Sequence, residues 1–321
     1  MGDRGPVPVG TGSAVEPRLG GLVGAGALAA ALFGLAAFVP ALAPLSFVSP
    51  LPIAIQRLRG GAVAAWLAAV LAAALVAAAE SPAPALGFLV ALALPGILLG
   101  ESLARGRGLV RGCSWAFGLL VLEVAIALLF TGDAIARRTL APFEHLRSEA
   151  FLSELRASGV PAEAINGFAE QATLMRDVIA VVFPAVWIIG AAVVVIANAG
   201  LLRFYLLRRD PGWLEDGEFE RVRFPLALVA VFILAGAAVA LPAARPFAYN
   251  VLLIVAFFFA LQGLAVVAFY ARRLAAPALL RVALLVLVLA NPWAPQILAL
   301  LGLFDNWFDF RRWAEPPREK V

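Results

Sequence analysis

The stretch VIAVVFPAVWIIGAAVVVIANAGLL, Val178–Leu202, has the length and composition of a helix that crosses a lipid bilayer. It contains no charged residue, and a crossing helix needs about 20 mostly apolar residues. Backbone groups inside a bilayer must bond to one another, which restricts spanning segments to helices and closed barrels. The stretch shows no strict alternation of apolar and polar residues, so it predicts a helix.

Similar apolar runs recur along the chain, and hydrophobic residues make up 63% of its 321 residues while charged residues make up 14%. This balance is typical of a membrane protein. We therefore predict an all-α, polytopic membrane protein with a disordered cytoplasmic tail over 1–18, one integral membrane domain over 19–312 and a second tail over 313–321. The other clear spans are Leu19–Val39, Gly61–Ala79, Ala83–Gly100, Cys113–Thr131, Phe224–Leu241, Tyr249–Ala271 and Val282–Phe304.

Arginines gather in alternate loops, which predicts a cytoplasmic N-terminus because cytoplasmic loops carry the excess of positive charge. Arg18 and Arg57 should then lie on one side, although only one clear span separates them. The segment 41–56 must cross back, which gives about 8–9 spans in total. It is short and contains three prolines. It is either a Pro-capped helix among its neighbours or a re-entrant segment beside a ligand pocket. Frequent alanine and arginine with little lysine indicate a GC-rich bacterial genome, and we expect a multi-pass protein of the bacterial inner membrane.

Two further segments are irregular. The excursion at about 132–177 is the one sizeable hydrophilic piece, and its periodicity predicts two amphipathic helices outside the membrane. They form either a solvated linker or a lid over an outward-facing cavity. Asn291-Pro292-Trp293-Ala294-Pro295 interrupts the span 282–304. Its length favours a single kinked crossing, and a hairpin of two half-helices is the alternative.

Polar side chains inside spans are costly and need a reason. Glu123, Gln262 and Asn291 fall at comparable depths in three separate spans. They either converge on a small polar ligand or form hydrogen bonds between helices. With one cysteine and one histidine, the chain offers no set of ligands for zinc, haem or an iron–sulfur cluster. We expect no metal and no cofactor.

The segment GLFDNWFDFRR, Gly302–Arg312, is the most distinctive local motif. Asp305 and Asp309 share a helical face at i,i+4, with Trp307 between them and Arg311 and Arg312 after them. Aromatic residues at headgroup level and arginines near lipid phosphates are typical of a membrane interface. The alternatives are that the two aspartates bind a metal or phosphate, and that the motif docks a partner.

Three segments resemble a known family. They are SPLPIAIQRLRGG (Ser49–Gly61), FFFALQGLAVVAFY (Phe257–Tyr270) and the Gly302–Arg312 motif. On these segments the chain resembles the YybS-like family of predicted bacterial membrane proteins, a domain of unknown function numbered 2232. The resemblance implies a distant likeness to substrate-binding (S) components of energy-coupling-factor transporters. It also implies that Pro40–Pro52 and the 132–177 excursion cover an outward-facing pocket, and that span one faces a coupling subunit.

Two functions follow as hypotheses. The chain is a small-molecule-binding or transport component, or else a membrane scaffold or envelope-assembly factor. We expect no enzymatic activity, because the sequence lacks a nucleophile motif with a histidine partner and a Gly-rich phosphate loop. Besides lipids, other membrane subunits are expected partners, since Gly20, Gly24, Ala27 and Ala31 recur at the spacing that lets helices approach closely. A net charge of +4 spread over short loops gives no indication of nucleic-acid binding.

Overall fold

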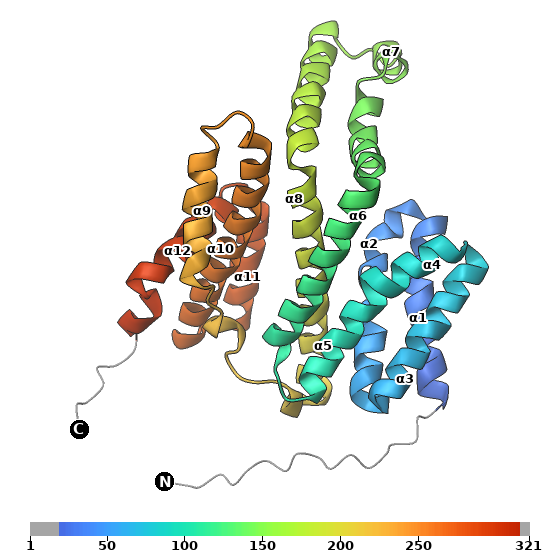
Figure 1. The fold of residues 1–321 in the computed structure, drawn as a ribbon, viewed down its shortest axis with the longest axis vertical. Helices are drawn as coiled ribbons and strands as arrows, with labels where there is room; N and C mark the ends of the chain where they lie inside the picture. The colour runs from blue at the N-terminus through green and yellow to red at the C-terminus, as the bar shows by residue number, and fades with distance from the viewer. Residues whose placement is uncertain (1–18, 315–321) are drawn as a thin grey trace. The chain divides into compact units, whose positions relative to one another are not determined.

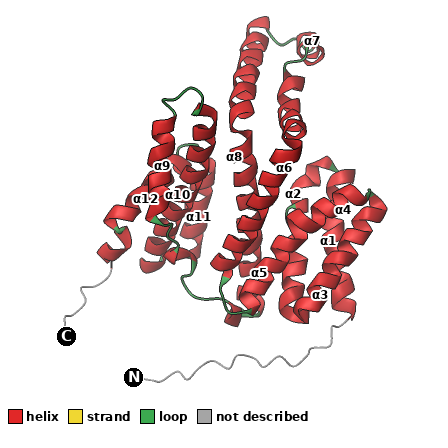
Figure 2. Ribbon diagram, viewed as in Figure 1, coloured by secondary structure: helices red, strands yellow, loops and turns green. Residues whose placement is uncertain are grey.

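The computed structural model describes residues 19–314, and these fold as helices and turns without a strand (Figure 2). The predicted all-α membrane fold is confirmed. By length and composition, five of the described helical segments are able to cross a membrane, and two shorter helices are also strongly apolar. The predicted tail over 1–18 lies outside the described residues, as do residues 315–321 of the second tail.

The chain divides into two compact units, shown with all element labels in Figure 1. Unit 1 extends to Glu123 and includes Ala192–Glu215, whereas unit 2 comprises Val124–Ala191 and the chain from Asp216 onward. Two long helices, α6 (Leu109–Leu146) and α8 (Ala162–Arg209), contribute residues to both units.

Unit 1 has a core of alanines with a few large side chains. Its other elements are α1 (Leu19–Phe38), η1 (Pro40–Leu42), α2 (Ala43–Ser46), α3 (Pro50–Ala79), α4 (Pro82–Phe88), the π-helical turn η2 (Leu89–Ala93), α5 (Leu94–Ala104) and η3 (Pro211–Trp213). Ala65, Ala69 and Ala72 are fully buried beside Phe88, whose ring meets that of Phe33 edge to face at 5.3 Å. Small side chains allow these helices to approach closely, as is common between helices in membranes.

The chain reverses direction inside α3, at Gly61. Gly61 has φ +82° and ψ −179°, a backbone conformation open essentially to glycine alone. Before it, the chain runs antiparallel to α1, because Gly21 lies beside Gln56 while Leu28 and Pro52 line one groove. After it, the chain runs parallel to α1, since Leu22 packs on Ala64 and Ala68, and Gly26 lies against Ala68 and Leu71. The predicted segments 41–56 and 61–79 are therefore separate, oppositely directed pieces of chain, and the membrane crossing of 41–56 stays a prediction.

Unit 2 contains the excursion and the C-terminal helices. Its elements beside α6 and α8 are α7 (Glu149–Ala157), η4 (Phe219–Arg221), α9 (Leu226–Ala238), α10 (Arg245–Arg273), α11 (Ala278–Ala290), α12 (Ala294–Phe308) and η5 (Phe310–Ala314). The excursion is helical, as expected, but α6 passes through residue 132 with non-helical angles at Thr131 and ends at Leu146. On the other side of the excursion, α8 begins at Ala162 and continues past Asp177 as one helix to Arg209. The polar segments at the two ends of the excursion thus belong to long helices that continue from apolar runs, and α7 between them is a separate helix that begins at the N-cap Ser148.

The helix over 282–304 is interrupted where the sequence predicts, and the choice between one kinked crossing and a hairpin stays a prediction. Helix α11 ends at Ala290, and α12 begins at Ala294. Asn291 adopts extended backbone angles, and its Oδ1 accepts a hydrogen bond from Trp293 N at 2.9 Å. This side chain thus replaces a helical backbone bond at the break, and Pro292 has no N–H to offer to a continuing helix.

Helices α10 and α12 cross at two glycines. A Cβ on Gly263 would overlap the Leu298 carbonyl, and a Cβ on Gly302 would overlap the Phe259 carbonyl. Both positions therefore require glycine for the observed backbone approach. The FALQG and GLFDNWFDFRR segments meet at this crossing.

Candidate functional site

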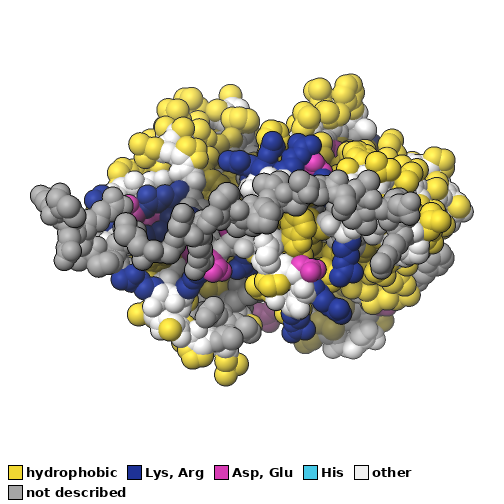
Figure 3. All heavy atoms as spheres, turned by 90° about the horizontal axis from the view of Figure 1, so that it is seen from below, with side chains coloured by type: hydrophobic (Ala, Val, Ile, Leu, Met, Phe, Trp, Pro, Cys, Tyr) yellow, Lys and Arg dark blue, Asp and Glu magenta, His cyan; other side chains and the backbone are white. Residues whose placement is uncertain are grey.

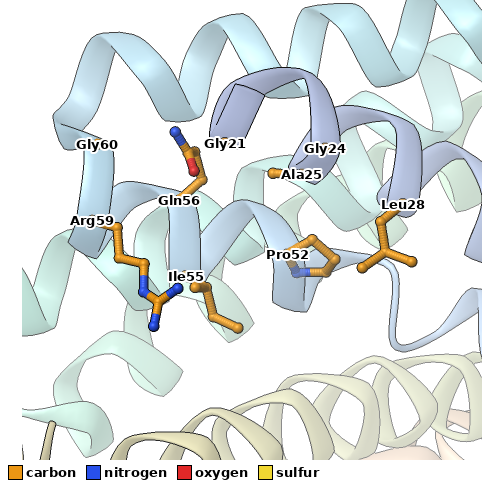
Figure 4. A pocket seen from close by; sticks show the side chains of 9 residues that line it. All are labelled: Gly21, Gly24, Ala25, Leu28, Pro52, Ile55, Gln56, Arg59 and Gly60. Atoms are coloured by element: carbon orange, nitrogen blue, oxygen red, sulfur yellow. The ribbon is translucent and has the colours of Figure 1, made fainter. Parts of the chain in front are cut away.

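Unit 1 contains an open groove between α1 and the first half of α3. It has a volume of about 600 Å³. Its walls come from both helices, as Figure 4 shows, and are formed by Gly21, Gly24, Ala25, Leu28, Pro52, Ile55, Gln56, Arg59 and Gly60. Five of these nine residues belong to the SPLPIAIQRLRGG segment.

Local sequence explains the groove. Pro50 and Pro52 occupy the first turn of α3, where proline fits a helix because the N–H it lacks would be unpaired there. Gly61 ends this half-helix by reversing the chain, so it presents only about three turns to α1. On the facing helix, a Cβ at Gly24 would meet no atom within 4 Å. The missing side chain leaves the space open.

Gln56 is the buried polar group of the groove. It is 7% exposed, and its carboxamide lies between Gly21 and Gly60. Among residues 19–314, this carboxamide has no hydrogen-bond partner. The carboxamide borders the open groove, so its donor and acceptor atoms stay accessible to water or to a ligand. The groove thus presents an amide with unused donors and acceptor.

Arg59 stands at the same end of the groove, and its guanidinium lies 5.3 Å from the centre of the Tyr205 ring. Cation–π contact orients the guanidinium without neutralising it. Within the described chain no carboxylate pairs with Arg59, whereas the nearby Arg57 pairs with Glu101. Glu101 also pairs with Arg105 at 2.6 Å. The positive charge of Arg59 therefore remains available to a ligand.

Unit 2 contains a second polar cluster, centred on the fully buried carboxylate of Asp305. Its Oδ1 accepts a hydrogen bond from Phe310 N at 3.1 Å, and its Oδ2 accepts one from Gln262 Nε2 at 3.1 Å. Gln262 is also fully buried, and its Oε1 accepts a hydrogen bond from Phe224 N at 2.9 Å. These bonds connect α10, α12, the segment before α9 and the turn after α12.

Two arginines balance the charge of Asp305. Arg311 Nη1 lies 3.5 Å from Asp305 Oδ2, and Arg223 Nε lies 3.7 Å from the same oxygen. Arg311 is 8% exposed and donates from Nη2 to the Val222 carbonyl at 3.0 Å. Burial lowers the pKa of the Arg311 guanidinium, yet an arginine stays protonated at neutral pH. Arg223 also pairs with Asp309, which in turn lies 4.0 Å from Arg312.

The helix face away from Asp305 is aromatic and exposed. Phe304, Trp307 and Phe308 of α12 are 44%, 54% and 55% exposed, and their rings contact one another around Phe304. This pattern fits the predicted interfacial or docking motif, with Asp305 turned into the unit and Trp307 turned outward. The described residues contain no group of acids, histidines or cysteines suited to a metal ion.

The predicted polar trio occupies different surroundings. Glu123 lies in unit 1 with a buried Oε2 that has no hydrogen-bond partner within the described chain. Gln262 and Asn291 lie in unit 2, where Gln262 belongs to the Asp305 cluster and Asn291 lies exposed at the α11–α12 turn. Their convergence on one ligand stays a prediction.

Two residues with clear structural roles are absent from the candidate site residues that the sequence indicates. Gln56 is one, and the only signal for it was an uncharged polar side chain directly before Arg57. Asn250 is the other. It accepts a hydrogen bond from Ala185 N and donates one to the Val181 carbonyl, each at 2.8 Å. It thereby bridges the turn of α8 that Pro184 opens.

In the view of Figure 3, several groups of Lys and Arg side chains (dark blue) are visible beside fewer Asp and Glu side chains (magenta).

Comparison with known proteins gives one match. No curated protein and no solved structure matches the chain. A family model described as "Predicted membrane protein (DUF2232)" matches residues 27–306, which is most of the chain and includes the reversal at Gly61 and the α10–α12 crossing. The chain therefore belongs to the DUF2232 family of predicted membrane proteins.

Proposed function

We propose that this membrane protein is a ligand-binding component and that its ligand occupies the groove between α1 and the first half of α3. The observation that carries this proposal is the carboxamide of Gln56, which lines the groove and has no hydrogen-bond partner among residues 19–314. A bound molecule would satisfy it, and the groove volume of about 600 Å³ falls within the range of roughly 300–1,000 Å³ common for small-molecule sites.

The lining supports the same function. Ligand sites are mostly apolar with a few placed polar groups, and here Gln56 and Arg59 are the polar groups among glycine, alanine and aliphatic side chains. The likeness to S components, implied by the sequence resemblance, favours capture of a ligand for transport. The protein would act by binding, without catalysis, in the bacterial inner membrane with its N-terminus in the cytoplasm.

Filling the groove tests the proposal. Gly24→Leu adds a side chain in the groove, and Gly20→Leu adds the same side chain to α1 outside it; a Cβ at either position meets nothing within 4 Å. Native mass spectrometry of protein purified in mild detergent should find a molecule bound to the wild type and to Gly20→Leu but lost from Gly24→Leu. Equal retention by both variants, with equal melting temperatures, would contradict the proposal.

A scaffold role is the second candidate, and the exposed aromatic face of α12 favours it. Asp305 fixes that face, which would then present Trp307 to a partner protein. A photo-crosslinker at Trp307, with Phe247 of α10 (73% exposed) as the control position, separates the outcomes. Cross-links to an envelope-synthesis protein from position 307 alone support the scaffold, and cross-links to lipid alone argue against it.

A further inference from the structure

We propose that the groove ligand is an anionic amphiphile, with its negative headgroup beside Gln56 and Arg59 and its apolar chain along α1 and the first half of α3. This inference rests on the proposed function and names the chemical class of its ligand. It follows from the unequal ends of the groove and from the one cation that borders it.

One end of the groove is polar. Gln56, Arg59 and Gly60 line it, with the Gln56 carboxamide next to Gly21 and the Arg59 guanidinium turned toward Ile55 (Figure 4). A carboxamide N–H and a guanidinium both donate hydrogen bonds, and a phosphate or carboxylate accepts several. The two glycines allow the Gln56 carboxamide to lie close to the backbone of both helices. Tyr205 holds the guanidinium in place and offers no negative charge.

The other end is apolar. Leu28 and Pro52 line it, with Ala25 and Ile55 between the two ends. Leu28 is 52% exposed on a helix with the composition of a membrane span. In a membrane this surface faces lipid tails, so an acyl chain of the ligand fits the same apolar surroundings without exposing polar groups. The groove is open along its side, so a ligand could enter from the lipid phase.

Charge around the groove favours an anion over a neutral molecule. Glu101 neutralises Arg57 and approaches Arg105, but it does not pair with Arg59. An anionic headgroup would provide the counter-charge that Arg59 lacks among residues 19–314. Hydrogen bonds to charged groups contribute about 1.5–3 kcal/mol, which corresponds to roughly tenfold or more in affinity.

The experiment offers the purified protein an equal mixture of phosphatidylglycerol and phosphatidylcholine with identical acyl chains. Native mass spectrometry then measures the ratio of the two bound lipids. The wild type should retain phosphatidylglycerol preferentially, and Arg59→Gln should lower that preference about tenfold. The matched control is Arg111→Gln, which makes the same charge change at an exposed residue of α6 outside the groove.

The source of the anion is tested by competition with inorganic phosphate. Displacement of phosphatidylglycerol by millimolar phosphate would identify a soluble anion as the better ligand, and persistence would identify the lipid. Equal retention of both lipids by the wild type, or equal effects of Arg59→Gln and Arg111→Gln, would overturn the anionic class. If Gly24→Leu still displaced a neutral molecule in that case, the proposed function would stand without this inference; if it displaced nothing, both would fail.

Discussion

Replacing Asp305 by asparagine should destabilise the protein strongly, although the two side chains have nearly the same shape. Asp305 is fully buried and accepts hydrogen bonds from Phe310 N and Gln262 Nε2. An asparagine there would place its Nδ2 amino group against a second hydrogen-bond donor, either Phe310 N or Gln262 Nε2. It would also leave the buried Arg311 without the carboxylate that balances its charge.

The magnitude follows from the burial of both partners. Breaking a buried ion pair by removing one partner costs about 3–5 kcal/mol, because an uncompensated charge stays behind. Desolvation of Asp305 itself opposes this effect, but Arg311 is only 8% exposed and cannot regain water. Asp309 offers a contrast, since its side chain is 26% exposed. Asp309→Asn should therefore cost about 1 kcal/mol or less.

Thermal unfolding in detergent, followed by circular dichroism, measures both variants. A loss of 3–5 kcal/mol corresponds to a fall in melting temperature on the order of 10 °C, and Asp309→Asn should fall by only a few degrees. Arg311→Met in the Asp305→Asn background should recover part of the loss, because it removes the unpaired charge. The reasoning is refuted if Asp305→Asn melts with the wild type, or if the two asparagine variants lose the same stability.

Three more substitutions test the packing. Gly302→Ala should lower the melting temperature, because its Cβ would overlap the Phe259 carbonyl at a cost of about 1–3 kcal/mol or more. The control Gly236→Ala in α9 brings its Cβ near no other atom and should be neutral or stabilising. Equal effects of the two substitutions would contradict the close approach of α10 and α12. Asn250→Leu leaves the Ala185 N–H unpaired and should cost roughly 1–3 kcal/mol, while Asn306→Leu loses only bonds within its own helix and should cost less in the same melt. Gly61→Ala should cost about 1–3 kcal/mol, since φ +82° with ψ −179° strains any side chain, and an unchanged urea midpoint would show that the reversal is absent.

The helical membrane fold was predictable because its signal is local. Apolar runs long enough to cross a bilayer leave few alternatives, and the prolines near Asn291 marked the break between α11 and α12 in advance. The reversal near Gly61 was also indicated, through the charge parity of Arg18 and Arg57. The continuation of α6 beyond Thr131 was not predictable from composition, because a change from apolar to polar residues does not by itself end a helix, and here it coincides only with a kink at Thr131.

The candidate sites were less accessible because they depend on which helices meet. Gln262 stood out as a polar residue in a span, but its partner Asp305 reaches it only through the close approach at Gly263 and Gly302. Gln56 drew no attention because it lies between prolines and arginines, where a polar residue is ordinary. Its burial becomes visible only when α1 and the chain before Gly61 are placed antiparallel.

The groove is tested most directly by a cryo-electron microscopy map of the protein in nanodiscs that contain phosphatidylglycerol. The account predicts non-protein density between α1 and the first half of α3, with a headgroup within hydrogen-bond distance of the Gln56 carboxamide and next to Arg59. A groove closed by its own side chains, or filled by another part of the same chain, would contradict it.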